Sequence, residues 1–195
     1  VGKESRVYLA LTPKNEKIAV KIFFPQSISF KKHKSYILGD HRFKSFRNNP
    51  YQIVKTWCSK EFRNLKRCFK AGVTVPEPLA FEGNILVMEF IGEMEPAPLL
   101  KDLTLEKPRE VLIQLIENIR KLWQKARLVH GDLSEYNVMV WCGKAYIIDW
   151  SSALERSHPR ALQLLIRDLK NILNYFEGNG VIVDFNEVLE YVTGV

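Results

Sequence analysis

The sequence has no long hydrophobic run and only three cysteines. No apolar stretch approaches the roughly 20 residues that a membrane-spanning helix needs, so we expect no membrane association. The cysteines, Cys58, Cys68 and Cys142, are odd in number and share no metal-ligand spacing. Such thiols are typical of buried or inert groups in a reducing compartment, and they predict a cytoplasmic protein.

Histidine is also scarce, with four residues in the chain. His33, His41 and His158 have no ligand-like partner at a useful spacing, so we interpret them as surface or capping residues. The chain begins with Val1 in place of Met, which suggests that the sequence starts inside a longer protein.

Positive charge is in excess: the formal net charge is +7 and the isoelectric point is near 9.3. An excess of this size suggests anionic partners such as a nucleotide, RNA or a ribosomal surface, although it also suits a protein that only needs a soluble surface. Six basic residues crowd the segment 31–47, and we expect either an RNA-contacting loop or a solvated one there. They are Lys31, Lys32, Lys34, Arg42, Lys44 and Arg47.

Hydrophobic periodicity predicts strands first and helices later. Alternating β-branched and aromatic residues predict strands over 6–10 and 17–24, and further strands precede and follow the turn at Gly83 and Asn84. Apolar positions at helical spacing predict a long helix over 50–71, a second from Pro108, a third from Pro159 to about Phe176 and a short one over 184–192. Two short strands, NVMVW and AYIIDW, lie between the second and third helices. This order predicts a small β-rich lobe and a mostly helical lobe, with the change near the Pro-rich segment 93–104.

One stretch, LVHGDLSEYNVMV at 128–140, places polar groups inside an apolar run. Asp132 and Asn137 are five residues apart, and Asp149 follows at the end of the next predicted strand. Upstream, the polar turn GKES precedes the first predicted strand, and Lys21 lies on the second. Phosphoryl transfer needs groups that hold phosphates, hard oxygen ligands for Mg²⁺ and a base near the acceptor hydroxyl. Lys21, Asn137, Asp149 and Asp132 supply these in the order used by protein-kinase-like enzymes.

Each piece alone is a weak signal, because a Val-Lys dipeptide in a strand usually marks only an exposed lysine. The D-x-x-x-x-N spacing between apolar strands, followed by a strand-end Asp, is much harder to obtain by chance. Together the pieces predict a kinase-like phosphotransferase.

These motifs resemble those of RIO-type atypical serine/threonine protein kinases, most closely the first RIO subfamily in an archaeal-like short form. The matching segments are GKESRVY (2–8), VKI (20–22), KTWCSKEFRNLKR (55–67), VPEPLAFEGNILVMEFIG (75–92), LVHGDLSEYNVMV (128–140), YIIDWSSALERSHPRAL (146–162) and RDLKNILNYF (167–176). The resemblance implies an α+β, two-lobed protein-kinase-like fold, with an N-lobe at 1–92 and a C-lobe at 93–195. It also implies that the activation loop and peptide-binding helices are absent.

The resemblance further implies roles for single residues. Asp132 would be the catalytic base, and Asn137 and Asp149 would hold the metal. Lys21 would contact the phosphates of ATP and pair with Glu61 on the long helix.

Other residues would contact the nucleotide. Glu89 and Ile91 would offer backbone groups to adenine, with Met88 at the gatekeeper position, and Ser5 would contact phosphate. The implied cofactors are ATP and Mg²⁺, with Mn²⁺ as an alternative ion.

The family also implies a second role, as an ATPase in small-ribosomal-subunit maturation. In that role Asp149 would accept a phosphate as an aspartyl-phosphate, and the partner would be a protein substrate or the pre-ribosomal small subunit, with RNA contact through 31–47. The chain departs from the family pattern at its start, where Val1-Gly2 replaces a longer Ser-Thr-Gly entry. Gly131 stands where conventional kinases have Arg, and Trp150 stands where they have the Phe of DFG.

Two alternatives remain open on the residues alone. Small-molecule kinases of the aminoglycoside or choline type also carry H-G-D-L-x-x-x-N, but the GKES entry, Asp168 and Asn171 and the short chain favour the RIO type. A catalytically idle ribosome-binding scaffold would have no chemical need for all four of Lys21, Asp132, Asn137 and Asp149. His130 is interpreted as structural, and Asp168 and Asn171 as either catalytic-loop partners or an exposed helix face.

Overall fold

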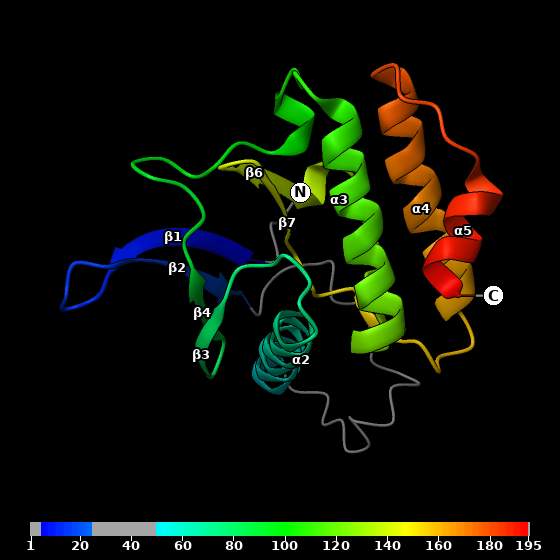
Figure 1. Cartoon of the computed structure of the whole chain (residues 1–195). Helices are drawn as coiled ribbons and strands as arrows, with labels where there is room; N and C mark the ends of the chain where they lie inside the picture. The colour runs from blue at the N-terminus through cyan, green and yellow to red at the C-terminus, as the bar shows by residue number, and fades with distance from the viewer. Residues whose placement is uncertain (1–4, 25–49, 195) are drawn as a thin grey trace.

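The computed structural model describes residues 5–24 and 50–194, in which a β-rich lobe is joined to a larger helical lobe (Figure 1). The basic segment 31–47, the turn residues Gly2 to Glu4 and the histidines at 33 and 41 lie outside the described residues. The smaller lobe holds a four-stranded antiparallel sheet in the order β1-β2-β4-β3. Its strands are β1 (Ser5–Leu11), β2 (Lys17–Phe23), β3 (Pro78–Glu82) and β4 (Ile85–Glu89).

The strand register puts one set of side chains on the face that carries Lys21. Val7 and Leu86 lie opposite Lys21 on the neighbouring strands, and Met88 lies opposite Ala19. Directly opposed residues of an antiparallel pair project from the same face of the sheet. This face is therefore largely apolar around Lys21, and Lys17 lies on the same face at the start of β2.

Helix α2 (Pro50–Lys70) packs on the same face of the sheet. Its Val54 and Cys58 form a small buried cluster with Phe23 and Leu86. The helix ends two residues before Gly72, whose φ of +76° lets the chain turn away, as the sequence predicted. The register and this packing bring the inner side of α2 close to Lys21.

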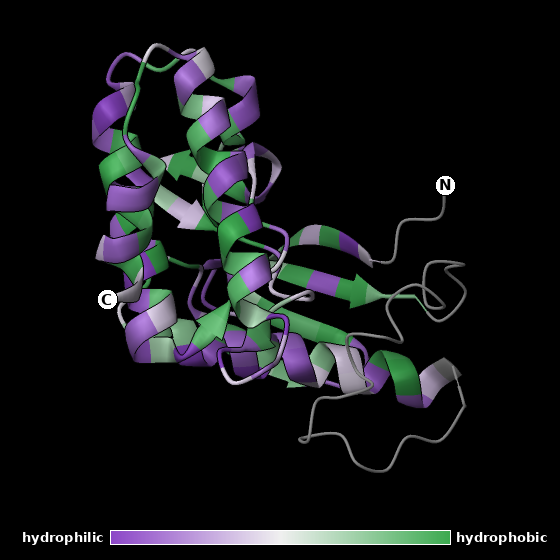
Figure 2. Cartoon of the chain, turned by 90° about the vertical axis from the view of Figure 1, so that its right-hand side faces the viewer, coloured by the Kyte–Doolittle hydropathy of each residue, from purple (hydrophilic) through white to green (hydrophobic). Residues whose placement is uncertain are grey.

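The larger lobe is built around three helices that stand side by side (Figure 1). They are α3 (Pro108–Lys121), α4 (Ala161–Gly178) and α5 (Phe185–Thr193). Their apolar stripes face one another and bury a large common core, while polar residues face outward (Figure 2). Trp57 and Trp123 are both buried.

Short elements complete this lobe and carry the polar stretch that dominated the sequence. The hairpin of β6 (Val138–Trp141) and β7 (Lys144–Ile147) is antiparallel, as is the two-residue pairing of β5 (Leu128–Val129) with β8 (Leu154–Glu155). Single turns of 3-10 helix lie at η2 (Leu100–Asp102) and η4 (Glu135–Asn137). Within the described part of the chain, no helix is both long and apolar enough to cross a membrane.

One expected boundary needs correction, and two further features were not anticipated. Helix α4 begins at Ala161, not Pro159, because residues 158–160 form a turn closed by the Ala161 N–H donating to the His158 carbonyl. Cys58 and Cys68 are buried, but Cys142 is exposed at the turn of the β6–β7 hairpin. Helix α3 continues as a π-helical turn, η3 (Leu122–Ala126), which the 3.6-residue pattern did not reveal.

Candidate active site

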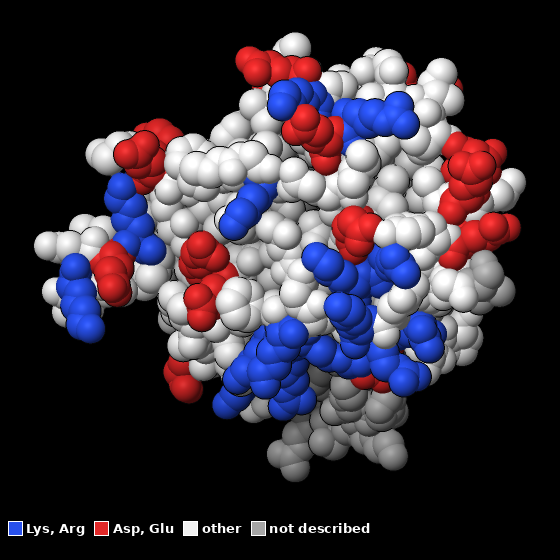
Figure 3. Space-filling model, viewed as in Figure 1, with Lys and Arg blue, Asp and Glu red and all other residues white. Residues whose placement is uncertain are grey.

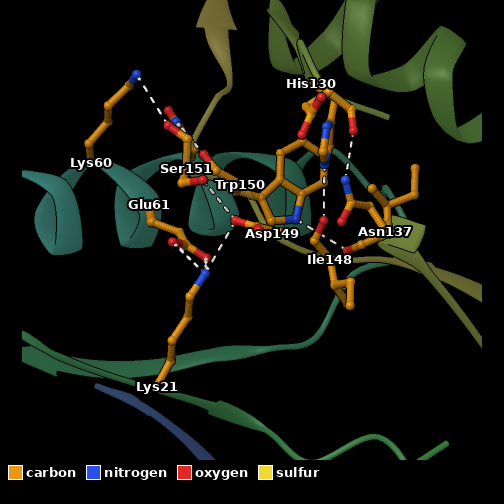
Figure 4. A network of polar contacts seen from close by, with 12 residues as sticks. Lys21, Lys60, Glu61, His130, Asn137, Ile148, Asp149, Trp150 and Ser151 are labelled. Carbon is orange, nitrogen blue, oxygen red and sulfur yellow. Dashed lines mark hydrogen bonds and ion pairs between the residues drawn. The ribbon is translucent and has the colours of Figure 1, made fainter. Parts of the chain in front are cut away.

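Lys21 lies at the centre of a partly buried ion-pair network between the two lobes (Figure 4). Its ammonium nitrogen is 2.7 and 2.9 Å from the two carboxylate oxygens of Glu61, and 3.3 Å from Oδ1 of Asp149. The sheet contributes Lys21, helix α2 contributes Glu61, and the chain after β7 contributes Asp149. A change in the position of any of the three elements would therefore alter the network.

The two carboxylates keep Lys21 charged although its side chain is buried. Burial by itself lowers the pKa of Lys21, but Asp149 and Glu61 outweigh that effect and raise the pKa above its ordinary value. The positive charge of Lys21 holds the pKa of Asp149 well below its usual range, and the Ser151 hydroxyl, 2.8 Å from Oδ1, acts in the same direction. The site therefore presents an ammonium and a carboxylate that both stay ionised at neutral pH.

The β6–β7 hairpin brings Asn137 and Asp149 together. Val138 lies opposite Ile147, and the Ile148 N–H donates to the Asn137 carbonyl at 3.0 Å. Asp149 lies two residues past the strand with a φ of +62°, a left-handed conformation that Asp adopts more readily than most residues. It is thus held in a turn beyond the strand, where its side chain points toward Lys21 (Figure 4).

The side chains of Asn137 and Asp149 fit a magnesium ion bound jointly with phosphates. The Asn137 amide group donates to the Asp132 carbonyl at 2.6 Å, and this contact fixes the side chain without using Oδ1. The bonds from Lys21 and Ser151 to Asp149 both use Oδ1, and its side chain is 48% exposed. Mg²⁺ commonly takes one or two protein oxygens together with substrate phosphates. No cluster of three or more His, Cys, Asp or Glu that could hold a metal occurs among the described residues.

Asp132 lies on a loop whose backbone is held on both sides by α4. Buried Asp168 accepts hydrogen bonds from the N–H groups of Gly131 (2.7 Å) and Leu133 (3.0 Å). Arg167 donates to the Gly131 carbonyl, and Asn171 donates to the Leu133 carbonyl at 3.0 Å. The residues before and after Asp132 thus have both backbone groups fixed, while its own side chain stays exposed.

Gly131 is required by this loop conformation. Its φ is +79°, and an added Cβ would lie 3.1 Å from the Ser152 carbonyl oxygen. The Arg of conventional kinases could not occupy the position without strain.

Removing the Asp168 carboxylate should destabilise the fold. In an Asp168→Ala protein the Gly131 and Leu133 N–H groups would be left buried without their acceptor, which costs about 2–4 kcal/mol for the pair. Urea unfolding would measure the change. Glu177→Ala, at an exposed position of the same helix, serves as the control and should alter the free energy of unfolding by under about 0.5 kcal/mol. Equal effects in the two proteins would contradict the assigned role of Asp168.

His130 and Trp150 pack beside the loop that carries Asp132. His130 is fully buried; its Nε2 lies 3.0 Å from the Ile148 carbonyl, which can only accept, so this nitrogen carries the proton. The imidazole contacts the Trp150 ring edge-on, with centroids 4.9 Å apart, and the Trp150 indole N–H donates to the Ile147 carbonyl. These contacts agree with a structural part for His130.

The residues expected to contact adenine lie at and just after the end of β4. Met88 is half-buried and touches both hydrophobic clusters, so it lies where the lobes join. The Glu89 N–H donates to the Glu77 carbonyl, and the Ile91 carbonyl accepts from Ala97. Glu89 is also paired with Ile18 across the β2–β4 ladder. Ser5 begins β1, opposite Phe23.

The turn after Ile91 depends on glycine. Gly92 has a φ of +142°, and a Cβ there would lie 2.2 Å from the Glu95 carbonyl oxygen. Only glycine permits this close return of the chain beside the expected adenine contacts.

Sequence reasoning missed several residues that shape the site. Asn64, three residues after Glu61, donates to the Trp150 and Ala153 carbonyls at 3.3 and 3.4 Å, and buried Lys60 donates to the Ser151 carbonyl. Val7, which lies opposite Lys21 on the same face of the sheet, is 57% exposed. The sequence did offer one signal for these residues. Lys60, Glu61 and Asn64 are polar residues that lie close together on one amphipathic helix.

The two lobes, the lysine between two carboxylates and the loop held by α4 define a protein-kinase-like fold and site. The profile of the RIO domain matches residues 6–188. The chain is 42% identical to human serine/threonine-protein kinase RIO1 over 98% of its own length and 35% of that protein. It is 39% identical to the RIO-type serine/threonine-protein kinase Rio1 of Thermoplasma acidophilum, over 90% of this chain and 92% of that one. The chain therefore belongs to the RIO family of serine/threonine protein kinases.

The comparison with solved structures concerns the fold. The Rio2 kinase of Chaetomium thermophilum, in an ADP/Mg²⁺-phosphoaspartate complex, superimposes with a TM-score of 0.73 at 23% identity, covering 99% of this chain and 60% of that one. The chain spans about a third of the human and Dictyostelium discoideum relatives, at 35% and 34% of their lengths. Family membership favours the RIO type over the aminoglycoside or choline kinases considered from the sequence.

Proposed function

We propose that this chain transfers the γ-phosphoryl group of ATP, with Mg²⁺, to a serine or threonine hydroxyl of a protein. The main observation in support of this proposal is that Lys21 lies between Glu61 and Asp149, while the Asn137 side chain is hydrogen-bonded to the loop of Asp132. These contacts join in one place the groups that hold phosphate, bind a hard cation and accept a proton. Phosphoryl transfer depends chiefly on such positioning and charge stabilisation.

In this reaction the acceptor hydroxyl oxygen forms a bond to the γ-phosphorus while the bond to the β,γ-bridging oxygen breaks and ADP leaves. Asp132 accepts the hydroxyl proton, and the backbone on either side of it is held by Asp168. Lys21 neutralises charge on the phosphates, and Glu61 orients the Lys21 ammonium group. Asn137 and Asp149 would hold Mg²⁺, which would neutralise part of the charge of the phosphates.

Asp149 also suits a second outcome, formation of an aspartyl-phosphate. Its carboxylate is ionised and half exposed, so an oxygen can attack the γ-phosphorus as ADP leaves; water would then release phosphate and complete an ATPase cycle. The structural neighbour Rio2 is described with a phosphoaspartate, and this supports the idea by analogy. An assignment to small-subunit maturation rests on the resemblance and on the net charge of +7.

The nature of the transferred label tests the proposal. We expect incubation with γ-labelled ATP and Mg²⁺ to label serine or threonine in an unstructured peptide mixture, giving acid-stable product, and EDTA to abolish it. Hydroxylamine-labile label on the chain itself would mark the aspartyl-phosphate. Transfer confined to choline or aminoglycosides would contradict the proposal, as would transfer that EDTA leaves unchanged.

A further inference from the structure

A band of Lys and Arg side chains lies along one edge of the molecule, where α2 ends beside η3 (Figure 3). Three stretches that meet here, 62–76, 118–131 and 150–163, contain ten Lys or Arg residues and one acidic residue. The acidic residue is Glu155, and it is bound to Arg67 at 2.8 Å. The balance of this surface is therefore strongly positive.

Hydrogen bonds show that the three stretches converge at one point. The Arg127 carbonyl at the end of η3 accepts from Nη2 of Arg67 at 3.5 Å and from the N–H of Arg156 at 2.9 Å. Arg67 lies on the last turns of α2, and Arg156 follows β8. We call the surface around this junction the basic face. Its members are Arg63, Lys66, Lys70, Lys125, Arg127 and Arg156.

Local helix electrostatics do not account for the whole basic face. Basic residues near a helix C-terminus interact favourably with its dipole, which explains Lys70 and Lys125. The effect falls off within one turn, so it does not explain Arg63, nearly two turns earlier, or Arg156, which lies beyond a strand. Several cations from separate segments on one surface are typical of a site that tracks a phosphate backbone.

An exposed aromatic ring borders the basic face. Phe69 is 43% exposed, and it follows Lys66 by three residues on α2, so the two side chains are neighbours on the helix surface. Aromatic rings beside Lys and Arg are the usual platform on which unpaired bases stack. One exposed ring among many charges suits RNA better than a membrane, which would require a broader apolar surface.

We propose that the basic face binds single-stranded RNA, with phosphates on its Lys and Arg side chains and an unpaired base on Phe69. The face is on the outer side of α2, whereas Glu61 and Asn64 are buried on its inner side. The proposal goes beyond the kinase reaction and does not depend on it, because RNA binding can be measured without ATP.

Fluorescence anisotropy of a labelled single-stranded RNA of about 20 nucleotides would test the proposal over a series of KCl concentrations. The test protein carries Lys66→Glu, Lys70→Glu and Arg127→Glu; the control carries Lys14→Glu, Arg109→Glu and Lys144→Glu, three exposed positions elsewhere. Each triple reversal lowers the formal net charge from +7 to +1. We expect the test protein to bind at least tenfold more weakly, with a salt slope shallower by about 2, and the control to retain most of its affinity. Equal losses in both proteins, or no loss in either, would overturn the proposal.

The substitution Phe69→Ala separates the contribution of base stacking to RNA binding from the contribution of charge. We expect it to weaken single-stranded RNA binding by about fivefold or more, with an unchanged salt slope, and to leave duplex RNA binding unaltered. Unchanged affinity for the single strand, or displacement of the RNA by polyglutamate of equal charge, would overturn the assignment to single-stranded RNA. Unchanged phosphoryl transfer in these proteins would show that the fold is intact.

Discussion

Replacing Asp149 by Asn should reduce phosphoryl transfer by about 10³-fold and leave the fold intact. The amide keeps the shape of the side chain but removes the negative charge that faces Lys21 and the proposed metal position. Lys21 would still pair with Glu61, so the buried ammonium would keep a partner. Transfer of label from γ-labelled ATP at saturating nucleotide would measure the loss.

The proposed role of Asp149 as a ligand of Mg²⁺ can be tested separately, by measuring the affinity for ATP. The unaltered chain should bind ATP more tightly with Mg²⁺ than with EDTA, and Asp149→Asn should lose most of that difference in calorimetric titrations. Asp184→Asn is a matched control, because Asp184 caps α5 far along the chain and asparagine caps a helix equally well. A Mg²⁺ effect that persists unchanged in Asp149→Asn would contradict the proposed metal site.

Replacing Asp132 by Asn should lower transfer by about 10²–10⁴-fold while ATP affinity stays close to that of the unaltered chain. Asp132 is exposed, and it contributes its backbone carbonyl, not its carboxylate, to the contact with Asn137. The substitution therefore removes the proposed base without disturbing that contact. Peptide phosphorylation and ATP titration, made on the same preparation, would separate the two effects.

Glu135→Gln provides the control for Asp132. Glu135 lies in the same loop, at the start of η4, and its substitution makes the same change of charge. It should leave the transfer rate within about threefold of the unaltered value, since a neighbouring charge is not a base. A loss in Glu135→Gln as large as that in Asp132→Asn would show that the net charge of the loop matters and that Asp132 has no special role.

The fold could be read from the sequence wherever the hydrophobic pattern ran for several turns or strands. The helix predicted over 50–71 is α2 at Pro50–Lys70, and the strand predicted over 17–24 is β2 at Lys17–Phe23. In each case one period dominates a long segment. The β5–β8 pairing was not predicted, because two residues per strand are too few to show any period.

Residues of the site were recognisable by spacing, but the contacts that hold them were not. Asp132, Asn137 and Asp149 stood out because polar groups interrupt apolar runs. The partners of Gly131 and Leu133 come from Asp168 on α4, about 35 residues along the chain, and only tertiary structure brings them together. For the same reason an exposed helix face was an equally good interpretation of Asp168 until the structure showed it buried.

The π-helical turn η3 also escaped prediction. Leu122, Trp123 and Ala126 are buried, and their spacing fits an ordinary helix as well as a widened one. The turn ends at Arg127 in a left-handed conformation with a φ of +55°, which leads directly into β5 and the loop of Asp132. Packing of the surrounding core, absent from a local pattern, selects this geometry.

The central claim is that Asp132 and Asp149 serve one phosphoryl-transfer step at a single site. Its most direct test is the single-turnover rate of γ-phosphate transfer from Mg²⁺-ATP in the unaltered chain, in Asp132→Asn, in Asp149→Asn and in the double variant. Groups that act as a unit are strongly non-additive, so the double variant should be about as slow as the slower single variant. Wild-type-like rates in either single variant, with the protein folded and ATP bound, would contradict the account.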